Sequence, residues 1–195
     1  NPDNDFEDFA NTGWGISVAK GELYFGRDDS GVVFGSTMGE SGMGSFLPGN
    51  VVANNIEGGL YIGENVSTAE VVSSIFGLIR SSVSSGFDTA AGNGDKVVTS
   101  PALHPPAIGI NPEDDQAIDI GSIAGTDVYE TRNLISSGYG PGIHVFEGGE
   151  AKNLDLDIVN NHIGVDWSGN TNLGNAEFGI TIDNGLSVEI GGDSD

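Results

Sequence analysis

Carboxylates are the side chains through which this chain could do chemistry. Asp155 and Asp157 alternate with apolar residues in the segment from Leu154 to Ile158. If this segment is a strand, the alternation places both carboxylates on one outward face, about 7 Å apart. Asp166 follows in the next turn, and oxygen ligands of this kind are the ones that Ca²⁺ prefers. The three residues are therefore candidate metal ligands, although outward strand positions are also often simply polar.

The residue after Asp166 is Trp167, inside the sequence V-D-W-S-G-N. An exposed indole beside carboxylates can stack on a sugar ring or on a neighbouring subunit. The same side chain could instead cover the edge of the folded chain, and the sequence leaves both interpretations open.

The remaining motifs supply no catalytic set. His104, His144 and His162 are separated along the chain, which predicts surface imidazoles rather than a metal site or a catalytic base. No G-x-S-x-G, H-E-x-x-H or phosphate-binding glycine loop occurs in the sequence.

The charge of the chain is one-sided, with 29 Asp and Glu against 6 Lys and Arg and a net charge of −23. A chain this acidic does not bind nucleic acid or anionic lipid through a basic surface. The lack of Cys excludes disulfides and cysteine-based sites, and no stretch is long and apolar enough to predict membrane insertion. The acidity fits plain solubility, a Ca²⁺-binding surface, or adaptation to a saline habitat, where salt screens the charges.

The elements that would position these side chains are short β-branched runs separated by Asn, Asp and Gly. Their near-regular spacing predicts strands of a stacked β architecture, and helical periodicity does not extend beyond the first dozen residues. Strands are expected at 15–19, 23–25, 31–34, 50–52, 59–62, 71–72, 75–79, 96–99, 107–110, 117–120, 133–136, 142–146, 156–159, 162–165, 179–182 and 188–190.

The length and the pattern indicate a single domain over residues 1–195. Residues 81–106 are rich in Ser, Gly and Pro and interrupt the strand pattern, which resumes after them, so we interpret them as a surface insertion. The acidic residues 1–13 contain two Phe and could form a short capping segment or a disordered terminus.

An internal duplication favours a repeat architecture. Residues 31–36, 49–55, 58–64 and 71–78 recur in the same order as 117–122, 132–138, 142–148 and 159–165, with a shift of roughly 85 residues. Short strands stacked at a spacing of about 4.8 Å would bury their inward Ile, Val, Leu and Phe side chains. Units of roughly 20 to 25 residues would give about eight or nine rungs.

Asn is expected at the turns of such a stack, because it tolerates the left-handed backbone conformation and can bond to the Asn of the next level. The candidates are Asn54, Asn55, Asn133, Asn160, Asn161 and Asn175.

Residues 160–192 resemble the repeat of bacterial and archaeal right-handed parallel β-helix surface proteins with IGTD-type repeats. They read N-N-H-I-G-V-D-W-S-G-N-T-N-L-G-N-A-E-F-G-I-T-I-D-N-G-L-S-V-E-I-G-G, and the upstream I-D-I-G-S-I-A-G-T-D-V-Y-E-T-R-N-L-I-S-S-G is similar to the same repeat. The resemblance covers 117–192 well and 31–79 more loosely. It implies an all-β fold, a right-handed parallel β-helix solenoid.

The resemblance also implies an extracellular or cell-surface location, although such repeats occur in adhesins, surface fibres and polysaccharide-degrading enzymes alike. We expect a non-enzymatic structural or adhesive protein that associates with itself as a filament or fibre subunit. The chain lacks a catalytic set and ends in I-G-G-D-S-D without a visible cap. The alternative is a carbohydrate-active enzyme, either a glycosidase or a polysaccharide lyase that uses Ca²⁺ at Asp155, Asp157 and Asp166.

Overall fold

The computed structural model describes residues 11–26, 50–80, 87–94, 104–123, 131–148, 154–183 and 188–191. These residues form β-strands and turns, and no helix among them is long and apolar enough to cross a membrane. Most of the expected capping segment and the strands expected at 31–34 and 96–99 lie outside the described residues.

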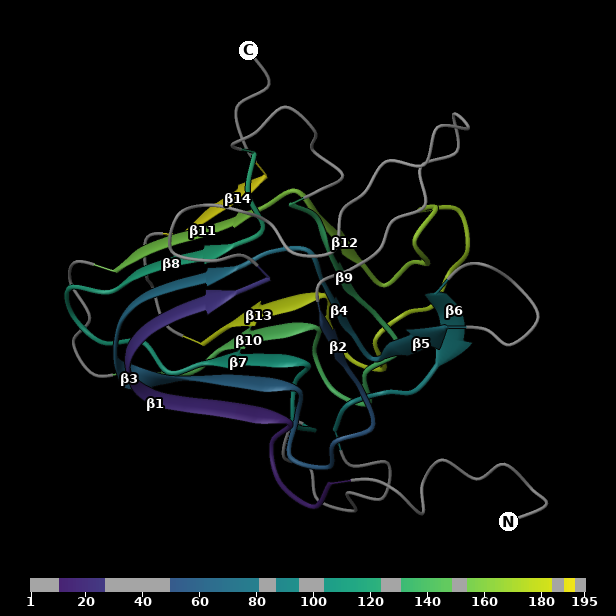
Figure 1. Cartoon of the computed structure of the whole chain (residues 1–195), viewed down its shortest axis with the longest axis horizontal. Helices are drawn as coiled ribbons and strands as arrows, with labels where there is room; N and C mark the ends of the chain where they lie inside the picture. Colours follow the sequence, from purple (N-terminus) through teal and green to yellow (C-terminus); the bar gives the residue numbers. More distant parts are fainter. Residues whose placement is uncertain are drawn as a thin grey trace.

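The fold consists of parallel strands stacked in three rows, a solenoid-like all-β architecture (Figure 1). Rows one and two together form one curled eight-stranded sheet, and row three is a separate four-stranded sheet beside it. Row one contains the first halves of β1 (Ile16–Phe25) and β3 (Leu60–Val71), then β7 (Ile108–Ile110), β10 (Ile143–Val145) and β13 (Ile180–Ile182). Row two contains the second halves of β1 and β3, then β8 (Ala117–Ile120), β11 (Asp155–Val159) and β14 (Glu189–Gly191). Row three contains β2 (Asn50–Val52), β4 (Ser74–Phe76), β9 (Asn133–Ile135) and β12 (Asn161–Ile163).

The core lies between the three rows and is built from inward side chains in register. In row one, Ile16, Leu60, Ile108, Ile143 and Ile180 occupy the same position of successive strands. The middle three are fully buried, whereas the first and last are only partly buried. Burying such a side chain contributes about 1.5–3 kcal/mol, so strands of three residues are stable only as members of the stack.

The Asn ladders expected at the turns are confirmed. Asn55 Nδ2 donates to Asn93 Oδ1 at 2.8 Å, and Asn133 Nδ2 donates to Asn161 Oδ1 at 3.0 Å. Asn175 belongs to the same system, because its Nδ2 donates to the carbonyl of the preceding level, at Ile135, at 3.1 Å. These amides satisfy backbone groups that the sharp turns leave unpaired.

The left-handed conformation predicted for Asn at these turns is also present. Asn54 and Asn160 have φ values of 59° and 52°. Asn160 is further held by bonds from its Nδ2 to the carbonyl of Ser122 at 2.9 Å and to Thr131 Oγ1 at 3.1 Å. In each pair of consecutive Asn residues, the first therefore adopts the left-handed conformation of the turn, and the second forms hydrogen bonds along the stack.

A second, smaller core covers the outer face of row three. β5 (Leu78–Arg80) and β6 (Phe87–Ala90) form an antiparallel hairpin at the start of the expected insertion. Leu78 packs with the outward Ile75 and Leu134, and Leu173 packs against them. After β6, the chain returns to the stack at Asn93, which accepts the hydrogen bond from Asn55 described above.

The number of levels differs from the expected eight or nine. The described strands form five levels, since rows one and two hold five strands each. The equivalent residues Ile108, Ile143 and Ile180 are 35 and 37 residues apart. One level needs three strands and three turns, so the expected unit of 20 to 25 residues was too short.

The duplication maps onto this arrangement. Residues 49–55 and 132–138 hold β2 and β9 in row three, and 58–64 and 142–148 hold the start of β3 and β10 in row one. In both comparisons the two copies lie two levels apart. The shift of roughly 85 residues therefore corresponds to two turns of the stack.

Candidate functional site

Outward carboxylates form a column on row two. Tyr24, Glu70, Asp119, Asp157 and Glu189 occupy one register position of five successive strands. Neighbouring strands lie about 4.8 Å apart, so the last four of these residues align their carboxylate side chains along the row; Glu70 is buried, at 4% exposed, whereas Asp119 and Glu189 are exposed. We call these four residues the carboxylate column. The sequence signalled only one of them as a candidate, because the column is visible only after the strands are aligned.

The structure places the three predicted metal ligands in different environments. Asp155 and Asp157 lie on β11 in row two, with Asp155 exposed and Asp157 half-buried. Asp166 follows β12 of row three and is 7% exposed. Within the described ranges, no three His, Asp or Glu side chains gather closely enough to hold a metal ion.

The Asp166 carboxylate organises its own loop. Its Oδ1 accepts hydrogen bonds from Ser168 Oγ at 2.8 Å and from the backbone N–H groups of Asn170 and Thr171 at 3.1 and 3.2 Å. Burial raises the pKa of the Asp166 carboxyl, but the hydrogen bonds from Ser168, Thr171 and Asn170 outweigh it, so the pKa lies below its ordinary value. Trp167 lies in the same loop and is 40% exposed, which leaves its indole accessible for stacking.

Two of the histidines, which lie in earlier levels, form hydrogen bonds with carboxylates of the last level. His144 Nε2 bonds to Asp183 Oδ2 at 2.7 Å, and His104 Nδ1 bonds to Glu177 Oε1 at 2.7 Å. Glu177 and Asp183 lie on either side of β13. The expectation of surface imidazoles is wrong for His144, which is 5% exposed and packs its ring against Phe146. The sequence could not pair these residues, because the partners lie one or two levels apart.

His162 lies on the outer face of row three. It is in register with the buried Leu134. Burial, followed by the positive charge of Arg132, lowers the pKa of His162, and the opposing effect of Asp166 is smaller. The imidazole is thus held in its neutral form more strongly than in an unfolded chain.

The last level leaves one end of the stack open. Within the described part of the chain, β12, β13 and β14 have one neighbouring strand each. Inward side chains that are fully buried in the middle of the stack become accessible here, and Ile190 is 56% exposed. The open end encloses a hollow of about 350 Å³, lined by Arg132, Ile158, Asn160, Asn161, His162, Ile163, Ile180, Ile190 and Gly191.

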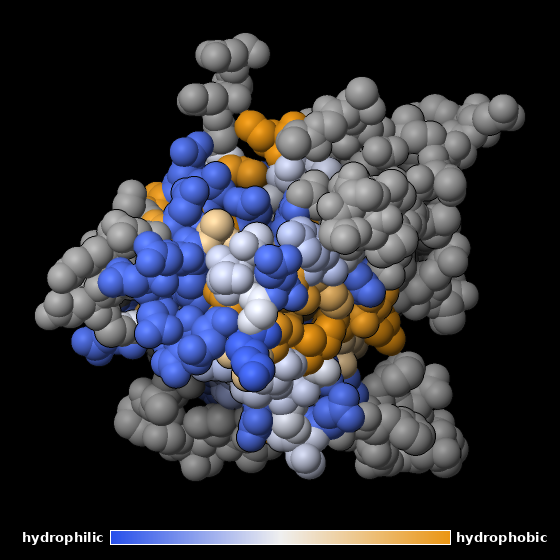
Figure 2. All heavy atoms as spheres, turned by 60° about the vertical axis from the view of Figure 1, so that its left-hand side comes forward, coloured by the Kyte–Doolittle hydropathy of each residue, from blue (hydrophilic) through white to orange (hydrophobic). Residues whose placement is uncertain are grey.

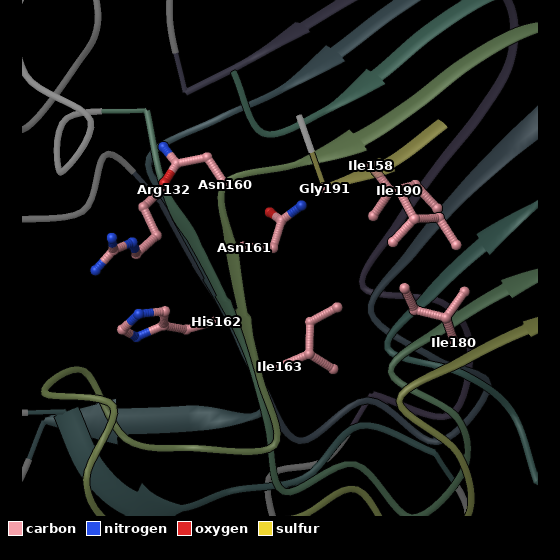
Figure 3. Close-up of a pocket in the computed structure, with 9 residues that line it drawn as sticks. All are labelled: Arg132, Ile158, Asn160, Asn161, His162, Ile163, Ile180, Ile190 and Gly191. Atoms are coloured by element: carbon pink, nitrogen blue, oxygen red, sulfur yellow. The ribbon is translucent and has the colours of Figure 1, made fainter. Parts of the chain in front are cut away.

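Figure 3 shows how this hollow is built. Ile158, Ile163, Ile180 and Ile190 lie on one side of β12, between the two sheets, whereas His162 and the nearby Arg132 point to the other side. The hollow is therefore lined by the end of the apolar interior on one side of β12 and by polar side chains on the other. Figure 2 shows one face of the molecule, on which hydrophilic residues cover much of the left and centre and hydrophobic residues gather below and to the right of the centre and near the top.

The opposite end of the stack has the same character. Among the described strands, β1 pairs only with β3, and β2 pairs only with β4. Ile16, Val18, Leu23 and Phe25 of β1 face the core but are only partly buried. Among the described residues, both ends thus present accessible apolar side chains in rows one and two, whereas Val52 of β2 in row three is buried. Each end also has one strand edge per row without a described neighbour.

Comparisons with known proteins give no match: no family model, no curated protein and no solved structure is similar to this chain. The site must therefore be interpreted from its own geometry.

Proposed function

We propose that this protein is an extracellular structural or adhesive protein without enzymatic activity. In this proposal the fold is a right-handed parallel β-helix, and copies stack end to end into a filament or surface fibre. The observation that carries the proposal is the last described level, where strand edges without a described neighbour surround the exposed Ile190 and the hollow behind it. Strand edges that lack a neighbour are templates for pairing with another chain.

The energetics of this end favour association. A free edge exposes backbone N–H and C=O groups, and a docked level would bond to them and bury the apolar side chains below. The net charge of −23 opposes association of two copies at low ionic strength. Salt shortens the range of this repulsion to about 3 Å at 1 M, so assembly should increase with salt concentration.

The enzymatic alternative has no comparable support. A Ca²⁺-dependent lyase needs its carboxylates in one groove, whereas Asp155 and Asp157 lie in row two and Asp166 follows row three. The Oδ1 atom of Asp166 already accepts three hydrogen bonds within its loop.

Light scattering after size-exclusion chromatography tests the proposal, together with negative-stain electron microscopy, at 0.1 and 1 M NaCl. The protein should form elongated assemblies whose mass grows with concentration and salt. Ile190→Lys should abolish them, because it places a charge on the open end. Ile123→Lys is the matched control, since Ile123 is 54% exposed but follows β8 in the middle of the stack. A monomer at every concentration and salt would overturn the proposal.

A further inference from the structure

We infer a specific joint between copies, which rests on the proposed end-to-end stacking. The last strands of rows one and two of one copy continue the same rows of the next copy in parallel register. β13 and β14 pair with the edge of β1 of the next copy that has no described neighbour, whereas row three has four described strands against five, so β12 does not reach β2 of the next copy. The two ends of rows one and two carry the argument, because they offer residues that suit one another.

Row one brings two hydroxyl side chains together. The outward residues of this row are Ser17, Tyr61, Gly109, His144 and Thr181. A continued row places Thr181 beside Ser17 of the next copy. The Thr181 hydroxyl is shielded from solvent and has no hydrogen-bond partner among the described residues. Ser17 is exposed, and hydroxyl pairs across neighbouring strands stabilise sheets.

Row two avoids a pair of carboxylates in direct register at the joint. Inside the chain, the column from Glu70 to Glu189 aligns carboxylate side chains in register. The residue at this position of β1 is Tyr24, which is 38% exposed and uncharged, and its hydroxyl donates to Glu22 Oε2 at 3.4 Å. A joint in register therefore places Glu189 beside an uncharged ring, and the column of aligned carboxylates stops at the joint.

The interior closes in the same register. Ile190 would lie against Phe25 of the next copy, which gives both side chains the covered environment that Val71, Ile120 and Ile158 have in the middle of row two. A two-fold joint between two last levels would instead bring Glu189 beside its own copy.

Disulfide trapping tests this register. The chain contains no native Cys, so every cross-link must form between the introduced residues. Four single variants are prepared: Ser17→Cys, Tyr24→Cys, Thr181→Cys and Glu189→Cys. Mixtures are made from one ¹⁵N-labelled and one unlabelled variant, in 1 M NaCl under mild oxidation. Neighbouring positions of a sheet have Cα atoms about 5 Å apart, within the range of a disulfide.

Heterodimers are expected from Thr181→Cys with Ser17→Cys and from Glu189→Cys with Tyr24→Cys. The crossed mixtures, Thr181→Cys with Tyr24→Cys and Glu189→Cys with Ser17→Cys, contain the same four variants and should give none. Electron microscopy of the unmodified protein should show an axial repeat of about 24 Å per copy, the height of five levels.

Three outcomes overturn the joint. If Thr181→Cys or Glu189→Cys forms homodimers, the ends meet about a two-fold axis. If filaments form with another repeat and no cross-link, the copies meet through a different surface. In both cases the proposed assembly stands and only the joint fails. If light scattering shows no assembly at all, the proposed function and the joint fail together.

Discussion

The carboxylate column makes a quantitative prediction about one substitution, Asp157→Asn. Asp157 lies between Asp119 and Glu189 in the register of row two. Two unit charges about 4.8 Å apart repel by roughly 0.9 kcal/mol in bulk water. Favourable side-chain pairs across neighbouring strands contribute about 0.2–1 kcal/mol, and like charges directly opposite destabilise a sheet, so we take a cost of the same order for each pair. Removing the charge of Asp157 relieves two such pairs, so the variant should be more stable by about 0.5–1.5 kcal/mol at low salt.

The assay is thermal and urea unfolding at pH 7 in 10 mM and 1 M NaCl, with chelator present so that no divalent cation bridges the column. For a chain of this length, 1 kcal/mol corresponds to about 2–4 °C in Tm. At 1 M NaCl the Debye length falls to about 3 Å, so the advantage of the variant should nearly vanish. The unmodified protein should itself gain stability with salt.

Asp155→Asn is the matched control. Asp155 lies on the same strand and the same outward face, but its register neighbour is Ala117. Its substitution removes an equal charge without relieving a neighbouring pair, so stability should change by less than about 0.5 kcal/mol. The reasoning is refuted if Asp157→Asn fails to stabilise at low salt, if its gain persists at 1 M NaCl, or if Asp155→Asn gains as much. Repeating the series with Ca²⁺ in place of chelator tests whether the column binds this ion. If it does, Asp157→Asn should be less stable than the unmodified protein instead of more stable.

Three further predictions concern the polar groups that hold the turns. Asn133→Ala should cost about 2–3 kcal/mol in urea unfolding, because it leaves buried backbone groups without partners, whereas the exposed Asn170→Ala should cost much less. His162→Leu should flatten the pH dependence of Tm: a lowered His pKa gives stability that is present above pH 6.5 and is lost as the pH falls toward the folded pKa. Asp166→Ala should cost about 1–2 kcal/mol at pH 7. That difference should shrink below pH 3.8, because a lowered carboxyl pKa gives stability that is lost as the pH falls through it.

The strands were predictable because most inward positions are Ile, Val or Leu, which only a stack can bury. β2 and β8 have the predicted bounds, and β7, β10 and β13 lie within the predicted runs. The turns were equally predictable, since Asn54 and Asn160 adopt the left-handed conformation that Asn tolerates. These are local signals, and each is complete within a few residues.

The arrangement of strands into levels was not predictable in the same way. The runs at 59–62 and 71–72 are parts of one bent strand, β3, which passes from row one to row two without a break. Asp166 is close to Asp157 in sequence, but the chain changes rows between them. The partners of His104 and His144 are 73 and 39 residues away. Such relations depend on the length of a level, which no short segment of the sequence encodes.

The match between the duplicated segments and whole levels has a consequence for how this protein can change length. A tandem duplication of a gene segment that begins and ends at equivalent positions, such as Ile108 and Ile143, inserts one complete level between two compatible neighbours. The new level meets the same inward side chains above and below, so no other part of the core must adapt. A single recombination event can therefore lengthen or shorten the molecule along its axis while the cross-section stays constant.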